Sequence, residues 1–75
     1  MTPALRLYGT AACHLCERAE ALLYAANVTA ETVDIAADDD LLARYGTRIP
    51  VLQRLDTSAE LGWPFDAAML QEFVG

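Results

Sequence analysis

Two cysteines, Cys13 and Cys16, are the residues of this chain whose type and spacing best fit a chemical reaction. They are its only cysteines, and they stand where an apolar run over residues 4–8 gives way to a helical pattern. Two thiols spaced i and i+3 across a helix start are within bridging reach, and the helix amides and dipole favour a thiolate on the first. The pair predicts a dithiol–disulfide redox centre, in which Cys13 is the nucleophile and Cys16 is the resolving thiol.

His14 lies between the two cysteines, where its protonated form could favour a thiolate and tune the redox pair. An exposed helix residue with only this indirect influence is an equally good interpretation. Two thiols and one adjacent imidazole cannot close a tetrahedral zinc shell, so we expect no metal site. A cluster shared between two chains would need ligands from outside.

The composition limits the partners of such a centre. Seventy-five residues predict one domain over residues 1–75, and a hydrophobic fraction of 55% is ample for its core. The net charge of −6, with no lysine, argues against nucleic acid and anionic membranes as partners. No stretch is long enough to span a membrane and no signal-peptide pattern opens the chain, so we expect a cytoplasmic protein. We also expect it to be a monomer. There a disulfide is more often catalytic or sensory than structural.

Hydrophobic periodicity and turn residues predict the elements that must position the cysteines. An acidic run, Asp38 to Asp40, predicts the first turn of a short helix that Gly46 ends, and Asp66 is a good N-cap for the last helix. The full prediction is strands over residues 4–8, 31–35, 49–54 and 59–62, with helices over residues 14–27, from 38 to 46, and after 66.

The order β-α-β-α-β-β-α predicts an α/β fold: a small mixed four-stranded sheet flanked by three helices on both faces. The first crossover implies parallel first and second strands, and the third and fourth form a hairpin. Cys13 then follows the carboxyl end of the first strand, at the sheet rim where the chemistry of open α/β sheets usually sits.

Pro50 is the second signal, because a proline that opens an apolar strand after Ile49 can carry a cis bond. A proline merely tolerated at a strand start is the simpler interpretation of this residue alone. Trp63 and Phe65 surround another proline at the entry to a helix, and we expect them to pack in the core rather than form a wall of the site. Tyr8 could pack in the core or line the cysteine pocket.

Taken together, these residues resemble the glutaredoxin-like group of thioredoxin-fold proteins over essentially the whole chain. Cys13-His14-Leu15-Cys16 matches the redox motif of that group, and Ile49-Pro50-Val51 resembles its cis-proline turn. Gly62 and Asp66 resemble its glycine-rich turn and its helix-capping aspartate. The resemblance implies that the turn at Pro50 faces the cysteines. It also implies that the Ile49 backbone, with Gly62 and Asp66 nearby, binds a peptide-like substrate or glutathione.

The chain departs from that group at three positions that concern glutathione. Thr10 stands where a basic residue is typical, Trp63 replaces the second glycine of a pair, and Phe65 replaces the first of two aspartates. Glutathione is an anion, so these changes should weaken its binding, although Arg48 could supply the missing positive charge. A surface arginine without that role is about as good an interpretation.

The sequence therefore predicts a thiol–disulfide oxidoreductase that acts on protein or glutathione disulfides. It needs no metal or organic cofactor, with glutathione as a candidate co-substrate. A non-catalytic thioredoxin-fold binding module, or a redox sensor whose disulfide state controls a partner, is the competing hypothesis, because a fold alone does not fix a function.

Overall fold

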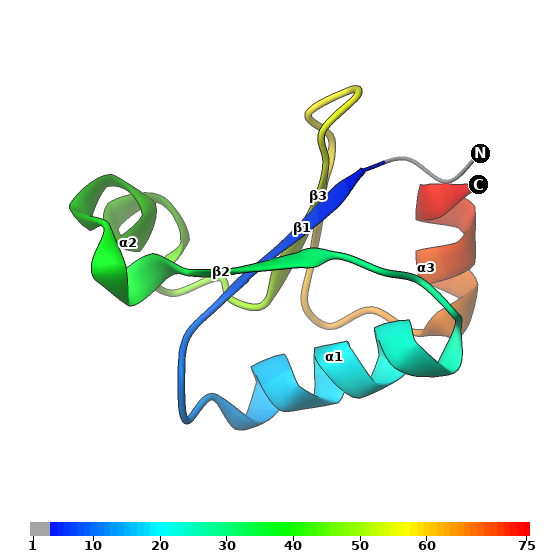
Figure 1. Cartoon of the computed structure of the whole chain (residues 1–75), viewed down its shortest axis with the longest axis horizontal. Helices are drawn as coiled ribbons and strands as arrows, with labels where there is room; N and C mark the ends of the chain where they lie inside the picture. Colours follow the sequence, from blue (N-terminus) through cyan, green and yellow to red (C-terminus); the bar gives the residue numbers. More distant parts are fainter. Residues whose placement is uncertain (1–3) are drawn as a thin grey trace.

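A computed structural model describes residues 4–75, and its central element is a four-stranded sheet in the order β2-β1-β3-β4 (Figure 1). Strand β1 pairs in parallel with β2 and antiparallel with β3, which pairs antiparallel with β4. The elements in chain order are β1 (Leu5–Gly9), α1 (His14–Ala25), β2 (Glu31–Asp34), the 3-10 helix η1 (Ile35–Ala37), α2 (Asp39–Tyr45), β3 (Val51–Arg54), β4 (Glu60–Gly62) and α3 (Ala67–Val74). The predicted mixed sheet with three helices is confirmed.

The two faces of the sheet bury different side chains because residues alternate along each strand. On one face Leu5 and Leu7 of β1 pack with residues of α1 and α3, including Ala19, Leu23 and Leu70. A second cluster contains Tyr8, Ile35, Tyr45 and Val51, which places α2 on the other face. Figure 1 accordingly shows α2 at the opposite end of the molecule from α3.

Capping side chains set the starts of the helices. Asp38 accepts hydrogen bonds from the backbone N–H groups of Asp40 and Leu41, at 2.9 and 3.2 Å, so α2 begins after it. Asp66 accepts one from the N–H of Met69 at 2.8 Å, which confirms it as the N-cap of α3. The predicted stop at Gly46 is also confirmed, since this residue is the C-cap of α2.

Several predicted boundaries were wrong by one or two residues, for local reasons. Ile35 was expected in the second strand, but Asp34 accepts a 2.9 Å bond from the N–H of Ala36 and turns the chain into η1. Helix α1 ends two residues before Asn27, which adopts a left-handed φ of 58°. The third strand begins at Val51 rather than Ile49, because the N–H of Ile49 bonds to the carbonyl of Tyr45.

Candidate active site at the Cys13–Cys16 disulfide

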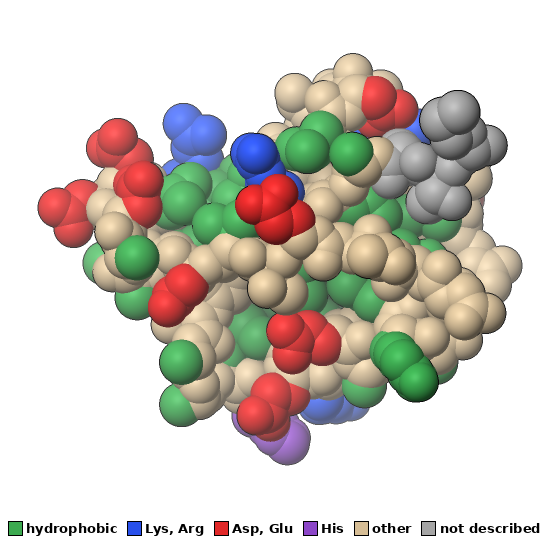
Figure 2. Space-filling view, in the orientation of Figure 1, with side chains coloured by type: hydrophobic (Ala, Val, Ile, Leu, Met, Phe, Trp, Pro, Cys, Tyr) green, Lys and Arg blue, Asp and Glu red, His purple; other side chains and the backbone are tan. Residues whose placement is uncertain are grey.

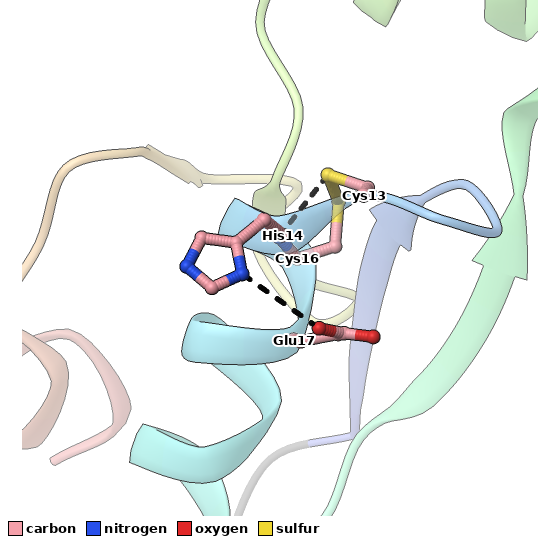
Figure 3. Close-up of a disulfide and its surroundings, with 4 residues drawn as sticks. All are labelled: Cys13, His14, Cys16 and Glu17. Carbon is pink, nitrogen blue, oxygen red and sulfur yellow. Dashed lines mark hydrogen bonds and ion pairs between the residues drawn. A yellow bond between two sulfur atoms is a disulfide. The ribbon is translucent and has the colours of Figure 1, made fainter.

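Cys13 and Cys16 form a disulfide at the start of α1, with their Cα atoms 5.2 Å apart (Figure 3). Cys13 is the N-cap residue, and its Sγ accepts a 3.1 Å hydrogen bond from the backbone N–H of Cys16. Cys13 is half-buried, whereas Cys16 is only 6% exposed. The N-terminal position supplies amide donors and the positive end of the helix dipole to the more accessible sulfur, an arrangement that stabilises negative charge there.

Two residues in the segment that leads to Cys13 adopt demanding arrangements that the sequence did not reveal. Gly9 ends β1 directly against Cys16, where an added Cβ would lie 2.9 Å from the cysteine Sγ. Ala12 has a φ of 58°, a left-handed conformation that costs a non-glycine residue about 1–2 kcal/mol. Strained backbone of this kind persists where the surrounding structure imposes it, often beside functional groups.

An open cavity of about 340 Å³ lies beside the disulfide, and both cysteines line it. Its walls are the loop from Gly9 to Ala12, the first turns of α1, and residues 32–34 of β2. Tyr8 is not among the lining residues; its ring stacks on Tyr45 with centroids 4.4 Å apart, and its hydroxyl donates to Gln53. The open question about Tyr8 is thereby settled in favour of the core.

The turn at Pro50 lies at the same edge of the sheet as the end of β1 that leads to the disulfide. In the β1–β3 register Tyr8 pairs with Val51, so the amino end of β3 lies at the same sheet edge as the carboxyl end of β1. Pro50 is buried, and the Ile49–Pro50 peptide bond is cis. The N–H of Ile49 donates to the carbonyl of Tyr45 at 3.1 Å, so this backbone donor is already engaged within the fold.

Arg48 lies next to this turn, in a cluster centred on Glu60 of β4. Its guanidinium donates to the Glu60 carboxylate at 3.2 Å and lies 5.6 Å from the centroid of the Tyr45 ring. The Tyr45 hydroxyl donates to the same carboxylate, and burial together with this hydrogen bond raises the pKa of Tyr45. The charge of Arg48 is thus balanced by Glu60 rather than free to serve a substrate alone.

Gly62 and Asp66 occupy the segment that follows β4. Gly62 pairs with Val51 beside the Pro50 turn, and the next residue, Trp63, donates from its N–H to the Pro50 carbonyl at 3.1 Å. The structure therefore brings Gly62 to the turn, whereas the Asp66 carboxylate is used as the cap of α3.

The aromatic pair of this segment belongs to the core, as predicted. Phe65 is 5% exposed, Trp63 packs against the same cluster, and the two rings meet edge to face with centroids 5.1 Å apart.

His14 projects away from the disulfide into solvent, with 83% of its side chain exposed (Figure 3). Its Nδ1 lies 3.9 Å from a carboxylate oxygen of Glu17, one turn along α1. An imidazole placed in this way could influence Cys13 through its charge, but it does not contact the sulfur as a base would.

Comparison with known proteins agrees with the fold. A family model described as Glutaredoxin-like domain (DUF836) matches residues 4–75. The chain belongs to this glutaredoxin-like family. No curated protein matches the sequence of the domain.

Solved structures share the fold of this glutaredoxin-like domain. The X-ray structure of target protein XcR50 from X. campestris has a TM-score of 0.87 and 41% identity, covering 93% of each chain. The solution structure of the same target has a TM-score of 0.84, also at 41% identity, covering 93% of this chain and 90% of that one. Protein Ne2328 from Nitrosomonas europaea has a TM-score of 0.80 at 26% identity, covering 100% of this chain and 94% of the other. The architecture is therefore thioredoxin-like, as the sequence predicted.

Across residues 4–75, no helix has the length and apolar character required to cross a bilayer. Over the same residues, no three His, Cys, Asp or Glu side chains converge as metal ligands would.

Proposed function

We propose that this glutaredoxin-like domain is a thiol–disulfide oxidoreductase. The observation that carries the proposal is the placement of Cys13: its sulfur caps α1, is bonded to Cys16, and lines an open cavity. A purely structural disulfide would gain little here, because closing so short a loop hardly constrains the unfolded chain. The pair is therefore better explained by chemistry than by stability.

The proposed reaction begins with the reduced dithiol. The Cys13 thiolate attacks one sulfur of a substrate disulfide, the substrate S–S bond breaks, and the first thiolate leaves and takes a proton from solvent. Cys16 then loses its proton and attacks the Cys13 sulfur of the mixed disulfide, releasing the second substrate thiolate. The substrate gains two electrons and the domain returns to the disulfide state. Both electrons come from the dithiol, so the exchange requires no metal or organic cofactor.

The substrate would bind at the sheet edge between the cavity and the Pro50 turn. In this proposal Pro50 and Gly62 shape the surface against which the substrate lies, and the Ile49 carbonyl accepts a backbone N–H from it. Arg48 and Asp66 would act from the periphery, since Glu60 and the N–H of Met69 already engage them. A thiol such as glutathione, or a thiol coupled to a reductase, would return the domain to the dithiol.

Trapping the mixed disulfide tests this function. Cys16→Ser should react with 2-hydroxyethyl disulfide and stop at a Cys13 adduct that mass spectrometry detects, while Cys13→Ser gives no adduct. The reduced wild-type protein should consume the same reagent and end with its internal disulfide. If the wild-type dithiol reacts no faster than a free thiol of ordinary pKa, Cys13 is not activated and the enzyme proposal fails in favour of a binding module.

A further inference from the structure

The charged groups that line the cavity beside the disulfide are all acidic. Glu17 and Glu20 enter the lining from α1, and Asp34 enters it from the end of β2. A hydrogen bond from the N–H of Ala36 holds the carboxylate of Asp34 in place. Among the residues that line the cavity there is no arginine and no histidine. Figure 2 shows acidic side chains over α1 and between α1 and β2 on the face turned to the viewer.

The arginines of the chain lie elsewhere, each against another group of the fold. Their partners are Glu31 for Arg6, the Trp63 ring for Arg18, the Tyr45 ring for Arg44, Glu60 with the Tyr45 ring for Arg48, and Asp56 for Arg54. Lysine is absent, and His14 faces Glu17 from outside the cavity. The acidic lining is therefore not balanced by a neighbouring cation, except where a protonated His14 offsets Glu17.

We propose that this site selects disulfides that carry positive charge close to their sulfur atoms and discriminates against anionic disulfides, oxidised glutathione included. The inference rests on the proposed function, because the cavity matters only if Cys13 attacks a substrate there. A substrate sulfur that approaches Cys13 from the cavity brings its substituents among Glu17, Glu20 and Asp34. Ammonium or guanidinium groups are attracted to that position, and carboxylates are repelled. The exchange is the two-electron reaction described above.

Three small disulfides of similar size and different charge provide the test. Cystamine carries two ammonium groups, 2-hydroxyethyl disulfide is neutral, and 3,3′-dithiodipropionate carries two carboxylates. Second-order rate constants for the reduced protein are divided by those of dithiothreitol with the same reagent, which removes differences in leaving-group reactivity. Electrostatic steering changes association rates by about 10–1,000-fold, so we expect cystamine to exceed the dicarboxylate at least about tenfold at low ionic strength. The ratio should fall toward one in about 1 M salt, where the screening length is about 3 Å.

Charge-neutralised variants assign the effect to the cavity. Glu17→Gln/Glu20→Gln/Asp34→Asn removes the acidic lining and retains an acceptor at the cap of η1. The matched control, Asp39→Asn/Asp40→Asn/Glu72→Gln, removes the same net charge from exposed positions of α2 and α3. The first variant should lose most of the cystamine preference and the second should keep it. The double variant Glu17→Gln/Glu20→Gln is altered only on the exposed surface of α1 and should lose part of the cystamine preference. It provides the test if the triple variant does not fold.

The outcomes separate this inference from the function on which it rests. If the wild-type protein does not react with the neutral disulfide, the proposed function fails. If it reacts with that reagent but treats the three charges alike, or if both triple variants change selectivity equally, the charge selection is refuted. Peptides joined by a disulfide and flanked by either arginine or glutamate distinguish the two sources of cationic substrate. Preference for the arginine peptide assigns the site to protein disulfides, and preference confined to cystamine assigns it to small molecules.

Discussion

Replacing Gly9 by alanine should destabilise the oxidised domain, because the new methyl group would enter the space of Cys16. An added Cβ would lie 2.9 Å from the Cys16 Sγ and 3.3 Å from its Cβ, so one group must move by about 0.6 Å to reach an ordinary contact near 3.5 Å. Overpacking of this kind costs about 1–3 kcal/mol. Loss of glycine flexibility in the unfolded chain returns about 0.4–1 kcal/mol, which leaves a net loss of about 1–2 kcal/mol.

Urea unfolding of the oxidised protein measures this loss, and the chain offers a matched control. Gly62 is also a strand residue, but no atom of a residue other than its chain neighbours would lie within 4 Å of a Cβ added there, and its φ is not positive. Gly62→Ala should therefore leave the unfolding free energy unchanged or raise it by about 0.4–1 kcal/mol. Equal changes for the two alanine variants would show that the contact with Cys16 does not limit position 9.

A variant that lacks the Cys16 sulfur tests directly whether this contact causes the loss of stability. In Cys16→Ala the sulfur is absent, and the nearest remaining atom to the new methyl group is the 3.3 Å Cβ of residue 16. Under reducing conditions the change Gly9→Ala should then cost less than about 0.5 kcal/mol when measured against Cys16→Ala alone, because contacting residues couple in a double-mutant cycle. A penalty that survives removal of the sulfur would refute the steric reasoning.

Three further predictions concern backbone strain, capping and a buried hydroxyl. Ala12→Gly should raise the unfolding free energy by about 0.5–1 kcal/mol in urea, because relief of the left-handed strain exceeds the entropic cost of glycine; a loss of stability would contradict the assigned conformation. Asp66→Ala should cost about 1 kcal/mol through loss of the cap of α3, while Asp66→Asn, which retains an acceptor for the N–H of Met69, should cost less in thermal unfolding. The raised pKa of Tyr45, caused by burial and by Glu60, means that the folded state holds this proton more tightly than the unfolded state. Stability linked to Tyr45 is therefore fully present below its ordinary pKa of 10.0 and falls as pH rises beyond it. Tyr45→Phe should flatten that fall in urea titrations between about pH 9 and 11, whereas Tyr24→Phe, at an 85% exposed position, should not.

The sequence was sufficient to predict the order of the elements and the position of Cys13 and Cys16 at a helix start, because both depend on local pattern. Periodic apolar residues specify the helices and strands, and Asp38 and Asp66 mark helix starts through their own backbone contacts. It was also sufficient to place Trp63 and Phe65 in the core, since apolar rings at a helix entry gain most from burial.

Other features of the site depend on residues distant in sequence and could not be predicted from it. Gly9 must be small because Cys16 packs against it, and only the folded arrangement of β1 and α1 brings the two together. Arg48 was a candidate for binding an anion, but β4 places Glu60 beside it. The left-handed conformation of Ala12 carries no signal in its residue type, although a glycine there would have suggested it.

The hydrogen bond from the N–H of Cys16 to the Sγ of Cys13 makes one atom serve two purposes: it begins the helix and it carries out the proposed attack. Any molecule bonded to Cys13 would therefore share its sulfur with the first turn of α1, and an adduct that displaced this sulfur would remove the cap of the helix. Release of the molecule restores the cap. The lifetime of a mixed disulfide on Cys13 would then depend on the stability of the first turn of α1 as well as on the reactivity of Cys16.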